Sequence, residues 1–381
     1  MTSRDLPHLA VLCDFAEEGW PSMDLAAEML LDQLASRHAH ELVATRVQPT
    51  YRRALTPLPR AGRNADRLLN RMVWYPRHVR AIRDRFDVFH VCDHSYSQLL
   101  LELPPERAGV FCHDLDTFRC LLDPQREARP RWFRAMARRI LRGFQRARVV
   151  FHATDAVREQ IVRHGLIDPA RLVKALLGTA PEFTPSRDEP SASRDRPYVL
   201  HVGSCIPRKR IDVLLDVFAA LRLQFASLRL IQLGGEWTDP QREQIARLHV
   251  AEHLEQLRNQ PRDVVAGLYR GATVVITTSE AEGFGLPVAE ALACGAPVVA
   301  SDIPALREVG GDAALYAPVG DVGEFARLAA IIVNNPTDAS IPARPHRLER
   351  AKLFSWSAHA DTIVRTYLGI ARGHHVMKVA R

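Results

Sequence analysis

The chain has 381 residues, which is too many for one hydrophobic core of ordinary size and suits two domains of about 150 to 200 residues each. Hydrophobic residues make up 47% and charged residues 25% of the chain, which excludes a largely disordered protein. The net charge of +7, carried by arginine, suits anionic partners.

The sequence shows neither a membrane span nor an export signal. No apolar run reaches the length of about 18 residues that a span needs, and the run within residues 1–15 is too short for a secretory signal. The six cysteines form no CxxC pair and no zinc spacing, so we expect buried, reduced thiols. A cytoplasmic protein is therefore expected.

The first half of the chain alternates short apolar runs with amphipathic stretches, which is typical of a parallel, doubly wound α/β sheet. We assign residues 1–184 to this Rossmann-like domain and residues 185–197, rich in Pro, Ser and charge, to a linker. The predicted strands are 9–12, 88–91, 109–112, 149–151 and 172–176, and the predicted helices include 24–34, 131–146 and 156–163.

The second half repeats the same alternation, and we assign residues 198–355 to a second Rossmann-like domain. Its predicted strands are 198–202, 228–233, 274–277 and 297–300, and a helix is predicted at 211–221. Ligands of such sheets bind beyond the carboxyl ends of the strands, so we expect the two domains to face each other across a cleft. Residues 356–381 are expected to form a helix and tail that cross back to the first domain.

The run at 277–304, TTSEAEGFGLPVAEALACGAPVVASDIP, carries the most chemistry. Gly283 and Gly285 precede a helix that Pro287 can begin, so backbone amides and the helix dipole can attract a phosphate there. Glu282 and Glu290 can both reach one small ligand, and carboxylates pair well with vicinal hydroxyls. The alternative is a plain glycine-rich turn with two solvated glutamates.

The segment from Glu282 to Glu290, EGFGLPVAE, resembles the E-x7-E signature of the retaining GT-B glycosyltransferases of family 4. The flanking segments LYRGA (268–272), ACGAPVVASD (293–302) and REVGGDAA (307–314) resemble the family as well. This resemblance implies that Glu290 binds the ribose of a nucleotide sugar. It also implies that Glu282 and the amides after it orient the donor sugar, through Gly283, Phe284, Gly285 and Leu286.

A second segment, HVGSCIPRKRID (201–212), resembles the family's strand end before a basic pair. The resemblance implies that Arg208 and Lys209 bind the donor diphosphate, with Gly203 and Ser204 beside them. Ser204 stands where many relatives carry an arginine. A diphosphate needs fixed positive charge, which this pair supplies. The alternative is a basic helix start in solvent.

In the first half, the segment FCHDL (111–115) resembles the family's strand end with an active-site histidine, which implies a catalytic role for His113. Gly19 and His94 are the expected residues on the acceptor side. His90 and Asp93 end the same strand as His94 and are further candidates. We therefore expect His113, Glu282, Arg208 and Lys209 to be the catalytic residues.

Asp114 and Asp116 spell DxD, which holds a divalent metal in another transferase architecture. Here the motif starts directly after His113, and the resemblance implies that cationic side chains and a helix N-terminus replace the metal. We therefore expect no metal site and no cofactor, and a donor that is a UDP-sugar or a GDP-sugar.

The stretch 126–148 carries nine arginines and one acidic residue, with apolar residues interleaved. Such a helix can lie on an anionic bilayer at the inner face of the membrane. The alternative is a helix whose apolar stripe packs inward while its arginines are solvated. No nucleic-acid-binding module accompanies the charge, so nucleic acid is not an expected partner.

The expected function is transfer of a hexose from a nucleotide diphosphate sugar to a hydroxyl of a glycan or lipid-linked acceptor, with retention of configuration and without metal. The rivals are a phosphorylase or a sugar-nucleotide epimerase of the same fold, and a non-catalytic binding partner.

Overall fold

The computed structural model describes residues 6–54, 61–185 and 197–379, so residues 186–196 of the predicted linker lie outside the described residues. The chain divides into two compact units. Unit 1 comprises Met1–Leu177 and Trp356–Arg381, and unit 2 comprises Gly178–Ser355. The predicted first domain runs to residue 184, but residues 178–184 belong to unit 2, where Thr179 N donates to Phe354 O at 3.2 Å.

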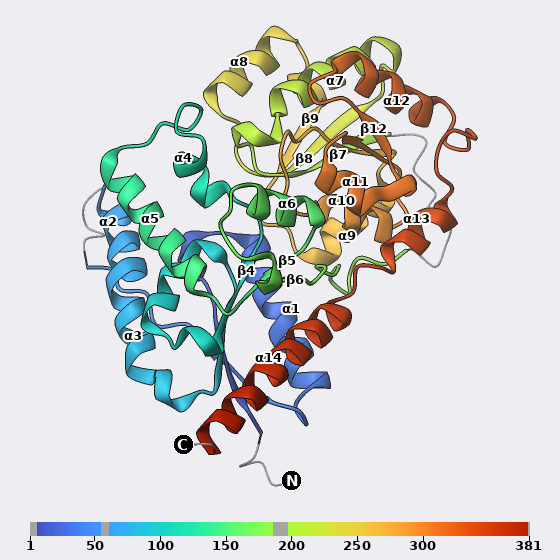
Figure 1. The fold of residues 1–381 in the computed structure, drawn as a ribbon. Helices are drawn as coiled ribbons and strands as arrows, with labels where there is room; N and C mark the ends of the chain where they lie inside the picture. Colours follow the sequence, from blue (N-terminus) through green and yellow to red (C-terminus); the bar gives the residue numbers. More distant parts are fainter. Residues whose placement is uncertain (1–5, 55–60, 186–196, 380–381) are drawn as a thin grey trace. The chain divides into compact units, whose positions relative to one another are not determined.

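Unit 1 is built on one parallel six-stranded sheet with helices on its faces (Figure 1). The strand order is β2-β1-β3-β4-β5-β6. The strands are β1 (His8–Leu12), β2 (Val43–Val47), β3 (Val88–Val91), β4 (Ala108–Cys112), β5 (Val149–His152) and β6 (Leu172–Lys174). The helices are α1 (Pro21–Arg37), α2 (Ala61–Leu69), α3 (Tyr75–Ile82), α4 (Arg119–Leu122), α5 (Arg131–Arg146), α6 (Asp155–Arg163) and α14 (Trp356–Val379).

Helix α14 ends the chain but packs within unit 1, beside α1 (Figure 1). Its Tyr367 is fully buried, and the hydroxyl lies 3.0 Å from His90 Nδ1 on strand β3. A side chain on Gly109 of β4 would collide with this hydroxyl, because its Cβ would lie 2.5 Å away. Tyr367 thus fits against the central strands of the sheet, so α14 is an integral part of unit 1.

Unit 2 has a second parallel six-stranded sheet, with the order β12-β11-β10-β7-β8-β9. The strands are β7 (Tyr198–Gly203), β8 (Arg229–Gly234), β9 (Leu254–Leu257), β10 (Val274–Thr277), β11 (Val298–Ser301) and β12 (Leu315–Ala317). The helices are α7 (Ile211–Gln224), α8 (Asp239–Arg247), α9 (Arg262–Gly271), α10 (Leu286–Ala293), α11 (Pro304–Gly310), α12 (Val322–Asn334) and α13 (Arg344–Ala351).

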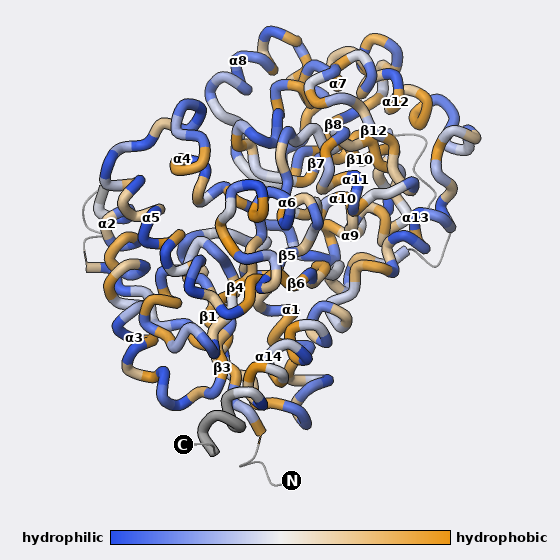
Figure 2. The backbone as a smooth tube through the Cα atoms, viewed as in Figure 1, coloured by the Kyte–Doolittle hydropathy of each residue, from blue (hydrophilic) through white to orange (hydrophobic). Residues whose placement is uncertain are grey.

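Each unit has its own hydrophobic core, formed where the helices cover the strands. Figure 2 shows hydrophobic colours on the central strands of both sheets and alternating colours along the helices. In unit 1 the core includes Phe89, Val110 and Phe144, and in unit 2 it includes Leu214 and Phe325. Strands covered on both faces read as continuous apolar runs, which is why these runs predicted strands.

Both sheets are doubly wound, and each has one point where the strand order reverses. In unit 1 this point lies between β1 and β3, and in unit 2 it lies between β7 and β10. At such a point the loops after the two strands turn away to opposite faces, which leaves a crevice at the carboxyl edge of the sheet. The loops after β7 and β10 are therefore the first place to look for a ligand site in unit 2.

Candidate active site

Three predicted donor-site residues meet at the reversal point of unit 2. Arg208 and Lys209 lie after β7 in the short 3₁₀ helix η8 (Pro207–Lys209), and Glu282 lies in the loop after β10. Lys209 Nζ is 2.5 Å from Glu282 Oε1, and Arg208 Nη1 is 3.2 Å from Glu282 Oε2. Ser279 Oγ also donates to Glu282 Oε1, at 2.7 Å.

This cluster of charges is largely buried. The side chains of Lys209 and Glu282 are only 11% and 7% exposed, so Lys209 is not the solvated lysine of the alternative interpretation. Burial alone would raise the pKa of Glu282, but the charges of Lys209 and Arg208 hold the pKa below its ordinary value. Glu282 is therefore ionised at neutral pH and is the counter-ion of both cations.

The turn that carries the basic pair is fixed by the loop after β10. Thr278 Oγ1 lies 2.9 Å from the carbonyl oxygen of Lys209 and 3.1 Å from that of Arg210. Glu280 N donates to Arg208 O at 2.9 Å. Arg210 has a φ of 49°, a left-handed conformation that is uncommon for a residue with a side chain. Helix α7 begins only after Arg210, so the basic pair precedes its first turn.

The loop before α10 has the predicted glycine geometry. Gly285 has a φ of 104°, and a Cβ there would lie 2.5 Å from the Leu306 side chain, so only glycine fits. Helix α10 begins at Leu286, and Pro287 lies in its first turn, where its missing N–H costs no hydrogen bond. Phe284, predicted beside the donor, packs its ring edge-on against Phe354.

The remaining predicted donor residues border the same loops. Gly203 ends β7 and Ser204 follows it, and both are half-buried. The Cβ position of Gly203 lies 3.7 Å from Lys209 Cε, so Gly203 borders the stem of that lysine. Gly283 is buried in the loop directly after Glu282.

Glu290 lies on α10 and is bound by a residue that the sequence motifs did not single out. Tyr269 of α9 donates its hydroxyl to Glu290 Oε2 at 2.9 Å. Burial raises the pKa of Glu290 to about 7, although the Tyr269 hydrogen bond and the charge of Arg262 act in the opposite direction. Tyr269 falls inside the LYRGA segment, and this place in the motif is the sequence signal that could have identified it.

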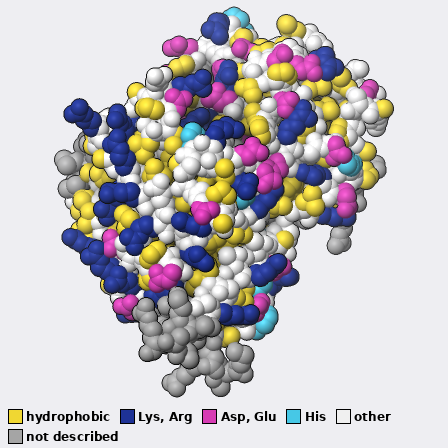
Figure 3. Space-filling view, in the orientation of Figure 1, with side chains coloured by type: hydrophobic (Ala, Val, Ile, Leu, Met, Phe, Trp, Pro, Cys, Tyr) yellow, Lys and Arg dark blue, Asp and Glu magenta, His cyan; other side chains and the backbone are white. Residues whose placement is uncertain are grey.

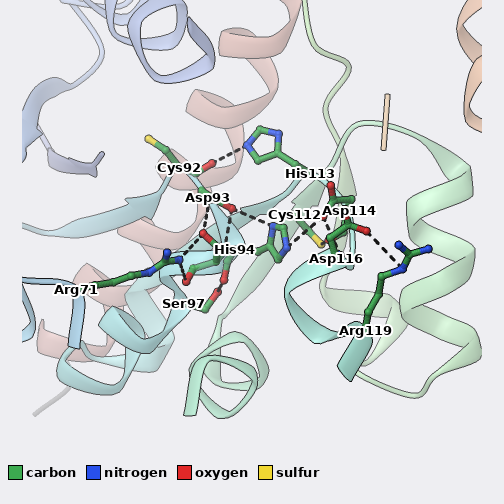
Figure 4. A network of polar contacts seen from close by, with 11 residues as sticks. Arg71, Cys92, Asp93, His94, Ser97, Cys112, His113, Asp114, Asp116 and Arg119 are labelled. Carbon is green, nitrogen blue, oxygen red and sulfur yellow. Dashed lines mark hydrogen bonds and ion pairs between the residues drawn. The ribbon is translucent and has the colours of Figure 1, made fainter. Parts of the chain in front are cut away.

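In unit 1, His94 and His113 lie close to Asp93 at the carboxyl edge of the sheet (Figure 4). His94 Nδ1 is 3.1 Å from Asp93 Oδ1, and His94 Nε2 is 3.6 Å from Asp114 Oδ1. Burial would lower the pKa of His94, but the adjacent Asp93 raises the pKa above its ordinary value. The two carboxylates on either side of His94 therefore favour its protonated form.

His113 is buried and neutral, because burial lowers its pKa. Its Nε2 lies 2.9 Å from the carbonyl oxygen of Cys92, which can only accept, so Nε2 carries the proton (Figure 4). Nδ1 is then left with a lone pair. His113 in this tautomer can accept a hydrogen bond at Nδ1, for example from a hydroxyl.

The loop after β1 brings further buried charge to this edge of unit 1. Gly19, with a φ of 70°, follows the 3₁₀ turn η1 (Ala16–Glu18). Glu18 Oε2 is bound by Arg71 Nη1 at 3.1 Å, and Asp14 is 4% exposed. Burial and the charge of Asp93 raise the pKa of Asp14 well above its ordinary value. The sequence interpretation missed Asp14 and Arg71, because a single charged residue beside a strand carries no distinctive pattern.

The two aspartates of the DxD segment have partners within unit 1. Asp114 Oδ1 accepts a hydrogen bond from Asp116 N at 2.9 Å, and Asp116 Oδ1 lies 3.6 Å from Arg119 Nε (Figure 4). Among the described residues, no group of three or more His, Cys, Asp or Glu side chains is arranged to hold a metal ion.

The arginine-rich stretch forms helix α5, whose apolar stripe faces inward. Ile140 and Phe144 are buried in the core, and Gly143 lets α5 approach the 3₁₀ helix η4 (His94–Glu102) closely. A Cβ on Gly143 would lie 1.9 Å from Ser97 O. These apolar residues therefore cannot contact lipid. This agrees with the alternative interpretation, in which the apolar stripe of the helix packs inward.

The outer face of α5 remains exposed and strongly basic. Figure 3 shows Lys and Arg side chains gathered over the region that Figure 1 labels α5. The exposed arginines of this face are Arg131, Arg138, Arg142 and Arg146, and the nearby Trp132 is 61% exposed. None of the helices described here is both long enough and apolar enough to cross a bilayer.

Comparison with known proteins shows the family of the region that contains the cluster of Arg208, Lys209 and Glu282. Residues 183–351 match the model of the family described as glycosyl transferases group 1. The chain contains a group 1 glycosyltransferase domain. The predicted resemblance is confirmed over this region, and with it the glycosyltransferase class of the enzyme. The basic pair, Glu282 and Glu290 all lie inside the matched residues.

Two curated relatives of this glycosyltransferase show how far the likeness extends. The O-antigen chain mannosyltransferase B of Escherichia coli is 28% identical over 349 residues, which cover 88% of this chain and 84% of that protein. A D-inositol 3-phosphate glycosyltransferase of Geodermatophilus obscurus is 30% identical over 242 residues. That match covers 59% of this chain and 53% of the relative.

Solved structures show the fold of the whole chain. Sucrose-phosphate synthase from Thermosynechococcus elongatus matches with a TM-score of 0.75 and 19% identity, covering 96% of this chain and all of that one. Anabaena HepE, solved with UDP-glucose, matches with a TM-score of 0.71 and 16% identity, covering 94% and 99%. The predicted GT-B fold class, with two Rossmann-like domains, is confirmed.

Proposed function

We propose that this glycosyltransferase moves a hexose from a nucleotide diphosphate sugar to a hydroxyl of a glycan or lipid-linked acceptor, with retention of configuration and without a metal ion. The buried cluster of Arg208, Lys209 and Glu282 carries this proposal. It supplies two fixed cations at the reversal point of the unit 2 sheet, where an anionic ligand of such a fold binds. Relatives named as mannosyltransferases and a neighbour solved with UDP-glucose support a hexose donor.

The reaction breaks the bond between the anomeric carbon and the oxygen of the β-phosphate, so negative charge grows on the leaving diphosphate. Lys209 and Arg208 stabilise this charge, and because they are fixed and partly desolvated they do so more strongly than solvent would. The bond from the acceptor oxygen to the anomeric carbon forms on the same face. The departing phosphate takes the proton of the acceptor hydroxyl, so no protein nucleophile is needed.

The two glutamates bind the neutral parts of the donor. Glu290 accepts hydrogen bonds from the ribose hydroxyls, and Glu282 with the amides after it orients the sugar hydroxyls. Glu282 already accepts from Lys209, Arg208 and Ser279, which fixes its position before a donor arrives. In unit 1 we assign the acceptor hydroxyls to the edge at His94 and Gly19, where Nδ1 of His113 can also accept a hydrogen bond.

The basic face of α5 supports a second part of the proposal, which is a peripheral contact with an anionic membrane. Four exposed arginines on one helix attract anionic lipid through long-range charge, and the exposed Trp132 suits the headgroup region. Because the apolar stripe of α5 is buried, the contact is electrostatic and salt-sensitive.

A donor panel tests the proposed function. Melting temperatures are measured with UDP, GDP, UDP-glucose and GDP-mannose, since a ligand at about 100 times its Kd adds about 2.7 kcal/mol of stability. We expect one base to be preferred and its sugar to be transferred to an acceptor. Absence of a shift with every nucleotide contradicts a donor site. Phosphate-dependent turnover indicates a phosphorylase, epimerisation without acceptor indicates an epimerase, and binding without turnover indicates a binding partner.

A further inference from the structure

Tyr269 and Glu290 form a contact between two helices of unit 2. Tyr269 lies in α9 and Glu290 in α10, and the tyrosine hydroxyl donates to Glu290 Oε2 at 2.9 Å. Both residues are buried, with Tyr269 0% and Glu290 7% exposed. A carboxylate on such a site can turn about its last side-chain bond unless one oxygen is held, so this hydrogen bond selects one orientation.

The tyrosine is itself fixed. Its ring packs edge-on against Phe183, with the ring centres 5.8 Å apart. Its hydroxyl group cannot ionise at physiological pH, because burial raises its pKa well above the ordinary value. Tyr269 is thus a permanent donor in a fixed place. Within the described part of the chain, Oε1 of Glu290 accepts no side-chain hydrogen bond, so this oxygen is the one left for a ligand.

We propose that Tyr269 is a positioning residue for the donor nucleotide: it holds Oε2 of Glu290 so that Oε1 is presented to the ribose hydroxyls. The inference rests on the proposed function, since it needs a ribonucleotide donor. The inference adds Tyr269 to the proposed donor site. Its aromatic ring packs against Phe183, and its hydroxyl acts on the ligand only through Glu290. A ligand preference for ribose over deoxyribose then depends on Tyr269, although Tyr269 does not contact the ligand.

The hydrogen bond also sets the charge of Glu290. Burial raises its pKa to about 7, and the Tyr269 hydroxyl acts against burial by stabilising the carboxylate. The other groups that act on the pair are Arg262 at the start of α9 and Cys294 at the end of α10. Loss of the hydroxyl therefore raises the pKa of Glu290 further, so a larger fraction is protonated at neutral pH and accepts ribose hydroxyls less well.

The test compares ribonucleotides with their deoxy forms by calorimetry. Kd is measured for whichever of UDP and GDP binds, and for its 2′-deoxy and 3′-deoxy counterparts, on wild type, Tyr269→Phe, Glu290→Gln and the double variant. We expect Tyr269→Phe to weaken binding of the ribonucleotide roughly fivefold to tenfold, as for the loss of one ordinary hydrogen bond. One of the two deoxynucleotides lacks the hydroxyl that Glu290 binds. The Kd of that deoxynucleotide should change less than twofold in Tyr269→Phe.

The double variant should be no weaker than Glu290→Gln alone, because both changes act on one contact. The affinity of wild type for the ribonucleotide should fall as the pH drops through the pKa of Glu290. In Tyr269→Phe the midpoint of this profile should move to higher pH. A merely structural tyrosine would not move this midpoint.

Tyr198→Phe is the matched control. Tyr198 also donates its hydroxyl to α9, to Leu268 O at 2.7 Å, but it does not contact Glu290. It should lower the melting temperature and leave the ratio of ribonucleotide to deoxynucleotide affinity unchanged. Phenylalanine keeps the ring that packs against Phe183, so Tyr269→Phe should fold. If it fails to fold, two measurements on Glu290→Gln still decide whether Glu290 binds the ribose: the pH dependence of nucleotide affinity, and the ratio of ribonucleotide to deoxynucleotide affinity.

Equal weakening of ribonucleotide and deoxynucleotide by Tyr269→Phe, or no weakening of either, overturns the inference. A wild-type protein that binds no nucleoside diphosphate instead contradicts the proposed function. The two failures are therefore distinguishable in the same set of titrations.

Discussion

Lys209 and Glu282 form a buried ion pair, with Nζ 2.5 Å from Oε1, across the two loops that meet at the reversal point of the unit 2 sheet. The residue proposed to bind the diphosphate is thus held by the residue proposed to orient the sugar. Each charge offsets the desolvation of the other, which makes the removal of either one costly. Lys209 is therefore a sensitive place to test the site.

Replacing Lys209 with Ala should lower kcat/KM by about 30-fold to several thousand-fold, because a desolvated charge contact is worth about 2–5 kcal/mol. The nucleoside without phosphates should bind nearly as before. Lys352→Ala, at an exposed lysine paired with Glu349, is the control and should change neither quantity. If kcat/KM of Lys209→Ala stays within about threefold of wild type, the diphosphate is bound elsewhere.

Replacing Glu290 with Gln should stabilise the protein at pH 8 and not at pH 5. The folded pKa of Glu290 is about 7, against an ordinary value of 4.5, so the stability associated with its proton is full below 4.5 and is lost as the pH rises through 7. Glutamine resembles the neutral form at every pH. We expect a melting temperature higher by roughly 5 °C at pH 8, together with weaker nucleotide binding. An equal shift at both pH values would contradict a titrating Glu290.

Turnover should continue in the presence of a chelator, because two protein cations, Arg208 and Lys209, act on the leaving diphosphate. The measurement is the initial rate with and without EDTA, using protein dialysed against chelator beforehand. Activity lost on chelation and restored by magnesium or manganese would show that a metal takes part.

The product should keep the anomeric configuration of the donor. Attack on the face from which the diphosphate leaves places the new bond where the old one was. Proton NMR of the first-formed glycoside reads the configuration from the coupling of the anomeric proton, before mutarotation of any free sugar interferes. An inverted anomeric centre is incompatible with the proposed mechanism.

Reversing Arg131, Arg138, Arg142 and Arg146 to Glu should release the protein from anionic vesicles at low salt. Each of these side chains is exposed on the outer face of α5, and an exposed arginine near a charged bilayer contributes about 1 kcal/mol. The control reverses four exposed arginines off this helix, Arg158, Arg163, Arg247 and Arg372, so the net charge changes equally. Equal loss of co-sedimentation in both variants would mean that net charge, not this face, governs binding.

All the strands that the sequence missed lie at the edges of the sheets, although the edge strand β6 was predicted. Runs such as 88–91 and 274–277 are central strands, buried on both faces, and they agree with β3 and β10. The missed strands β2, β9 and β12 are all edge strands. Their residues are partly exposed, so hydrophobic and polar positions mix and no apolar run appears.

In the site, too, the sequence predicts features that depend on a short segment and misses features that depend on contacts between distant segments. Arg208, Lys209 and Glu282 lie in short segments with a distinctive pattern, so the sequence could name them. Their mutual ion pairs depend on two loops about 70 residues apart, which only the sheet order brings together. Tyr269 was missed as a partner of Glu290 because a buried tyrosine on a helix resembles any core residue.

The place of α14 has a consequence for how the chain is made. Unit 1 needs Tyr367 against β3 and β4, but all of unit 2 lies between β6 and α14 in the sequence. On the ribosome, unit 2 is therefore synthesised in full while the first sheet still lacks the helix that covers its central strands. The usual order, in which the N-terminal domain completes its folding first, is not open to this chain. The nascent first unit must persist with an exposed apolar surface until α14 emerges.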